Sequence, residues 1–135
     1  MQSSSIACQK INPFKGKSVF YPKKKWFYKS IGNTLTREES DQVFDESVVP
    51  DSRQIAKGTL KKFAKIDFEK PHVPLLFIAG EEVQIIPKQL NEKNFNKYKD
   101  TNSKRDFKVF EGRGHYICGD KNWEEVATFI YEWIK

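Results

Sequence analysis

A chain of 135 residues, with 38% hydrophobic, 14% aromatic and 31% charged residues, fits one globular domain and excludes a chain that is disordered throughout. Its net charge of +6 is uneven, because the first 37 residues hold eight of the 24 Lys and Arg and no acid. A basic field over the whole domain is therefore excluded, and we expect only the N-terminal third to attract an anionic partner.

Residues 1–14 are mostly polar and are predicted to form a disordered tail. They lack the charged start and apolar core of a signal peptide, and no run of about 18 apolar residues predicts a membrane span. Cys8 and Cys118 have no metal-ligand spacing, which argues against a disulfide framework or a zinc site. We expect a reduced, cytoplasmic protein without metal or cofactor.

The segment KGKSVFYPKKKWFYK, residues 15–29, interleaves six lysines with five aromatic residues. This mixture is typical of a binding module that stacks on nucleic-acid bases or lies on an anionic surface. It is also typical of a surface segment whose aromatic rings dock on a neighbouring layer while the lysines reach solvent, because burial of aromatic rings is common. The sequence leaves both interpretations open. The lysines of this basic patch are Lys15, Lys17, Lys23, Lys24, Lys25 and Lys29.

Two short helices are predicted next. Thr36 followed by Glu39 is a capping box, which predicts a helix start in TREESDQVFDES. Asp51 is predicted to cap a second helix over residues 52–65, interrupted by Gly58. Together with the basic segment, these helices make residues 15–69 a region that looks more like a lid than a core.

The character of the sequence changes at residue 70. The apolar run VPLLFIAG, residues 73–80, predicts a buried strand, Pro87 opens a helix over residues 88–99, and DFKVF predicts a second strand. This order predicts a parallel pair of strands, with room for a third between them. Asp120 is predicted to cap a final amphipathic helix over residues 123–134. The fold class is α/β.

Residues 73–135 resemble the C-terminal portion of α/β-hydrolase-fold proteins of the esterase- and lipase-like kind. The resemblance lies in VPLLFIAGEE, the following IIP, GRGHYICG and WEEVATFIYEWI. It implies that the loop after the first strand carries a catalytic acid and that His115, in the second loop, is the catalytic histidine. It also implies a helical cap over about residues 30–64 and hydrolysis of a small-molecule ester or amide substrate by a Ser-His-Asp mechanism.

Two features depart from that family. Val83 stands where the family has its aspartate, and only the neighbouring Glu81 or Glu82 offers a substitute acid. None of the nine serines lies in a Gly-x-Ser-x-Gly turn, and only two strands are predicted where a complete fold has roughly eight. We therefore expect a truncated, inactive cap and C-terminal portion that self-associates or needs a chain supplying the missing N-terminal half. The alternative is the non-catalytic binding module.

Overall fold

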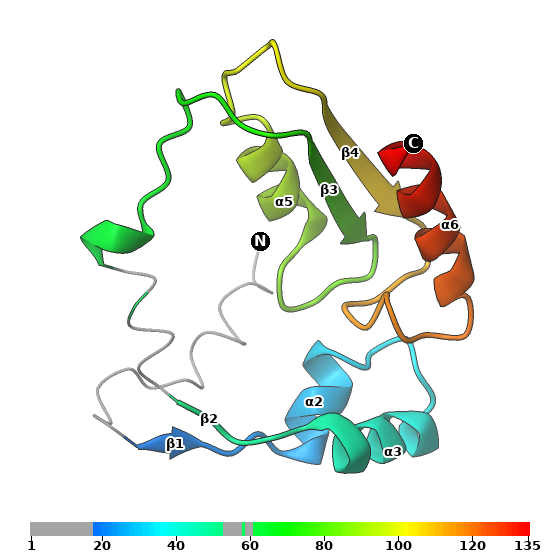
Figure 1. The fold of residues 1–135 in the computed structure, drawn as a ribbon. Coiled ribbons are helices and arrows are strands. Elements are labelled where there is room, and N and C mark those ends of the chain that lie inside the picture. Colours follow the sequence, from blue (N-terminus) through cyan, green and yellow to red (C-terminus); the bar gives the residue numbers. More distant parts are fainter. Residues whose placement is uncertain (1–17, 53–57, 59–60) are drawn as a thin grey trace.

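The computed structural model describes residues 18–52, 58 and 61–135. The predicted tail, Lys15, Lys17 and half of the helix expected over residues 52–65 lie outside the described residues. The described residues form both helices and strands, which confirms a mixed α/β chain (Figure 1). The elements are β1 (Val19–Phe20), α2 (Lys24–Ser30), α3 (Arg37–Ser47), β2 (Asp51–Ser52), a 3-10 turn (Lys62–Ala64), β3 (Leu75–Gly80), α5 (Lys88–Phe95), β4 (Arg105–Phe110) and α6 (Trp123–Ile134).

The two predicted strands form a parallel pair. β3 and β4 are direct neighbours, with Leu75 opposite Arg105 and Gly80 opposite Phe110, so no third strand lies between them. Within the described residues these strands pair only with each other, and β1 and β2 form a separate antiparallel pair. Because the strands are parallel, both carboxyl ends lie at the same edge of the sheet, and the loops after them leave side by side.

Helix α5 covers one face of the sheet. The register places Phe77 beside Phe107, and the Phe95 ring of α5 lies 5.7 Å from the first and 5.8 Å from the second, centroid to centroid. Tyr98 packs on the same side against Phe77 at 5.6 Å. Helix α5 ends at Phe95, whereas the sequence predicted a helix through residue 99. Beyond Phe95 the chain turns, and Tyr98 packs on the sheet from outside the helix.

Helix α6 covers the opposite face. Side chains alternate along a strand, so Asp106 and Phe110 point away from α5. Phe110 contacts Phe129 of α6 edge to face at 5.6 Å, and the Trp133 indole N–H donates to Asp106 at 2.6 Å. Phe110 and Val126 are 4% and 2% exposed. The sheet therefore lies between α5 and α6, as Figure 1 shows, and this layer is the main core of the chain.

The N-terminal helices form a smaller packed unit. The predicted capping box is confirmed: the Thr36 hydroxyl accepts from the Glu39 N–H, and the Glu39 carboxylate accepts from the Thr36 N–H. Phe27 of α2 packs edge to face on Phe44 of α3 at 5.6 Å, and Ser40 is fully buried between the helices. Figure 1 shows this unit beyond the carboxyl ends of β3 and β4.

Two predicted caps are wrong. Asp51 belongs to β2, where it pairs with Phe20 of β1, so its backbone is extended rather than at the start of a helix. The cap of α6 is Asn122, and the Asp120 carboxylate lies two residues before it, in an ion pair described below. No described helix has the length and apolar character needed to cross a membrane.

Candidate functional site

Two loops meet at the carboxyl edge of the sheet. The loop after β3 begins at Glu81, whose N–H donates to the Phe110 carbonyl of β4 at 2.9 Å. One residue later, the Glu82 N–H donates to the Arg113 carbonyl at 2.9 Å. These bonds continue the strand pairing into both loops. Backbone hydrogen bonds therefore hold the loop after β3, where the acid was expected, against the loop after β4, which contains His115.

His115 lies in the loop after β4, two residues beyond Arg113. Its side chain is exposed to solvent, yet the surrounding protein removes part of the hydration of the imidazole, and this partial burial lowers the pKa of His115. Within the described part of the chain the imidazole has no hydrogen-bond partner. A lowered pKa favours the neutral imidazole, which is the protonation state that a general base needs.

Val83 stands where the resemblance places the acid. Its side chain is buried, with 9% exposed. Lys88 donates to the Glu81 carboxylate at 3.0 Å, and together with the Gly112 N–H it lowers the pKa of Glu81. The Glu82 side chain is exposed, while its backbone carbonyl accepts from the Asn33 amide at 2.8 Å. The structure thus brings both glutamates to the same edge of the sheet as His115 and pairs neither carboxylate with His115.

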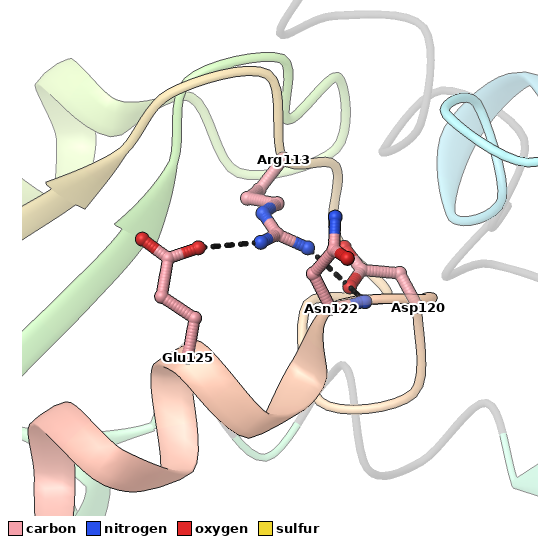
Figure 2. Close-up of polar contacts among 4 residues, drawn as sticks. All are labelled: Arg113, Asp120, Asn122 and Glu125. Carbon is pink, nitrogen blue, oxygen red and sulfur yellow. Dashed lines mark hydrogen bonds and ion pairs between the residues drawn. The ribbon is translucent and has the colours of Figure 1, made fainter.

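An ion-pair network around a buried arginine, not predicted from the sequence, holds the loop after β4, residues 111–122, which we call the histidine loop (Figure 2). Arg113 Nη1 lies 2.5 Å from Asp120 Oδ1, and Arg113 Nη2 lies 2.6 Å from Glu125 Oε2. Hydrogen bonds from Arg113, first to Asp120 and then to Glu125, raise the pKa of the arginine. The signal in the sequence was an arginine between two loop glycines, followed by acids at the start of a helix, and that signal is too common to be recognised alone.

The N-terminal unit touches the histidine loop. The turn between α2 and α3 places the Asn33 and Thr34 side chains against Gly114, so closely that a Cβ atom at Gly114 would lie 2.7 Å from the Thr34 hydroxyl. Lys121 also pairs with Glu39 of α3 at 2.8 Å. Hydrogen bonds from Lys121 and the Thr36 N–H lower the pKa of Glu39 to about 2.

A polar cleft of about 430 Å³ lies between the N-terminal unit and the start of α6. Its walls carry both signs of charge, and His115 is not among the residues that line it. The lining residues are Thr34, Leu35, Thr36, Glu39, Glu111, Gly112, Arg113, Asp120, Lys121, Asn122 and Glu125. Since Arg113, Glu39 and Lys121 already have ion-pair partners, the cleft offers few unsatisfied charges to a ligand.

The described part of the basic segment packs inward with its rings. Phe27 is 6% exposed, Trp26 meets Phe20 edge to face at 5.9 Å, and Lys24 pairs with Asp45 at 2.5 Å. These contacts are those of a docked surface segment. Lys23, Lys25 and Lys29 are exposed, and binding to an anionic partner stays a prediction.

No protein-family model matches the chain, and no curated protein matches it. Among the residues that the structure describes, no group of three or more His, Cys, Asp or Glu side chains is placed to hold a metal ion.

Proposed function

We propose that the chain forms the cap and C-terminal portion of an α/β-hydrolase fold of the serine-hydrolase type, with His115 as its general base for a small ester or amide substrate. The observation that carries this proposal is the position of His115 after β4, beside the loop that follows a parallel neighbouring strand. Helices on opposite faces of the sheet and a helical unit beyond its carboxyl edge also fit.

In this chemistry His115 takes the proton of a serine hydroxyl as the oxygen attacks the acyl carbon, and later gives the proton to the leaving group. The lowered pKa of His115 keeps the ring neutral near pH 7, which leaves a nitrogen free to accept that proton. The acid that normally orients the ring is missing, because Val83 has no hydrogen-bond acceptor in its side chain.

The nucleophile and oxyanion hole must come from outside these 135 residues, because the sequence has no Gly-x-Ser-x-Gly turn. In the resemblance β4 is the last strand of the sheet and β3 the penultimate one, so the supplying segment would pair along the outer edge of β3. The chain alone therefore has no meaningful turnover, since loss of triad members costs on the order of 10³ or more in kcat.

Restoring the acid tests this proposal without the missing segment. Val83→Asp places a carboxylate at the family's acid position, where it would face His115 and raise the imidazole pKa by about 1 unit or more. NMR titration of the two histidines measures this shift, with His72 as an internal reference. Gln84→Asp is the matched control, because it adds the same charge one position along, at an exposed residue.

A rise in the pKa of His115 that is specific to Val83→Asp supports the hydrolase-like arrangement of the two loops. An unchanged His115 in a folded Val83→Asp protein, or an equal rise in Gln84→Asp, would show that position 83 does not face the histidine and would overturn the proposal.

A further inference from the structure

The base of the histidine loop contains a buried cation. Arg113 is 8% exposed, and its guanidinium is shared between two carboxylates at 2.5 and 2.6 Å, as Figure 2 shows. Removing an arginine from water is unfavourable unless its N–H groups are paired, so this side chain strongly favours the one loop conformation that brings both carboxylates within reach. The network therefore specifies loop geometry.

The two carboxylates come from the far end of the loop. Asp120 closes the segment that began at Arg113, and Glu125 lies in the first turn of α6. Asp120 also accepts the N–H of Asn122, the helix cap, at 3.1 Å. Residues 113–120, which include His115, are thus joined across their base by a side-chain bridge and attached to the start of a helix.

The backbone of Arg113 attaches the same point to the other loop. Its carbonyl accepts the Glu82 N–H at 2.9 Å, and Gly80 packs directly against that carbonyl. The position that anchors the histidine loop through its side chain is therefore also the position where the two loops of the candidate site meet.

We propose that Arg113, through its ion pairs with Asp120 and Glu125, is the residue that positions His115 at the carboxyl edge of the sheet. The meaning of this position for catalysis rests on the proposed function. The placement of the imidazole by the ion pairs is a separate claim and can be tested separately.

The test is an NMR titration of both histidines in Asp120→Asn and Glu125→Gln. Removing a negative charge near a histidine lowers its pKa by electrostatics alone. Release of the loop would raise the pKa of His115, because an imidazole that regains its hydration returns toward the ordinary pKa of 6.5. We expect the pKa of His115 to rise in both variants, more in Asp120→Asn, because Asp120 is 9% and Glu125 64% exposed.

His72 is the internal reference, since it packs against Tyr98 at 5.3 Å and takes no part in the network. Glu132→Gln is the matched charge control on α6, where it removes an exposed ion pair with Lys135. A His115 pKa that falls or stays constant in a folded variant overturns the inference, even if thermal stability drops. If Asp120→Asn unfolds the chain and moves both histidines together, the sign of the shift in the milder Glu125→Gln decides.

The result of the titration in Asp120→Asn and Glu125→Gln is independent of the result for Val83→Asp. A positive result here with no effect of Val83→Asp would mean that Arg113 positions a histidine that is not a hydrolase base. A positive result for Val83→Asp with no rise in these variants would mean that the base is placed by the backbone alone.

Discussion

The two loops at the carboxyl edge of the sheet are stabilised in different ways. The loop after β3 turns a buried valine into the protein and keeps its carboxylates on the surface, where Glu81 pairs with Lys88. The loop after β4 buries an arginine between two acids and leaves its histidine exposed. The difference teaches that one loop is fixed mainly by an apolar side chain turned into the protein, whereas the other is fixed by ion pairs of a buried arginine close to an exposed histidine.

The largest effect is expected from the framework that both loops share. Phe110 ends β4, is 4% exposed and contacts Phe129 of α6. Phe110→Ala removes a ring from a packed layer and should lower the free energy of unfolding by about 3–5 kcal/mol. Chemical denaturation measures the loss, and a change below about 1 kcal/mol would show that α6 does not depend on this contact. Both loops should lose order together.

A smaller loss of stability is expected from substitution of a glycine where the two loops touch, and its size should differ between Gly80 and Gly114. At Gly80 an added Cβ would collide with the Arg113 carbonyl and would lie 2.6 Å from the Gly114 carbonyl, both of them backbone atoms. Gly80→Ala should therefore destabilise the protein by about 1–3 kcal/mol. At Gly114 the nearest atoms belong to side chains that can rotate, Thr34 and Asn33. Gly114→Ala is the matched control, and a cost as large as that of Gly80→Ala would contradict the idea that the two loops are joined through backbone.

The smallest effect concerns the contact between α3 and the histidine loop. Glu39 has a pKa of about 2 in the folded protein and an ordinary value of 4.5, so it contributes stability above about pH 4.5 and loses it as the pH falls toward 2. Glu39→Gln keeps a capping side chain and removes the ion pair with Lys121. Its melting temperature should lie below that of the unmodified chain near pH 7 and converge with it near pH 2.

Glu38→Gln controls for this last prediction, because it makes the same charge change in the same helical turn. A pH-independent difference for Glu39→Gln, or an equal effect of Glu38→Gln, would show that the Lys121 pair does not couple the helical unit to the loop.

Local patterns predicted those elements whose signals lie within a few residues. The capping box at Thr36, the strand at Leu75–Gly80 and the amphipathic helix ending at Ile134 are present as expected. The same local reasoning failed at Asp51 and Asp120, since an acid beside a predicted helix can equally join a strand or pair with an arginine. At the candidate site, the order of strands and loops along the chain was enough to predict that His115 lies at the carboxyl end of a parallel strand.

The sequence by itself determined the alternation of strand and helix after residue 70, the loop that contains His115 and the presence of a valine at position 83. These features depend on periodicity, chain order and residue identity. Only the tertiary structure decided which polar groups meet. The Asn33 amide donates to the backbone carbonyl of Glu82 across 49 residues, and Arg113 pairs with Asp120 and Glu125 among the 18 acids of the chain. Pairing of this kind is decided by burial and distance in the packed chain, and neither quantity can be read from spacing along the sequence.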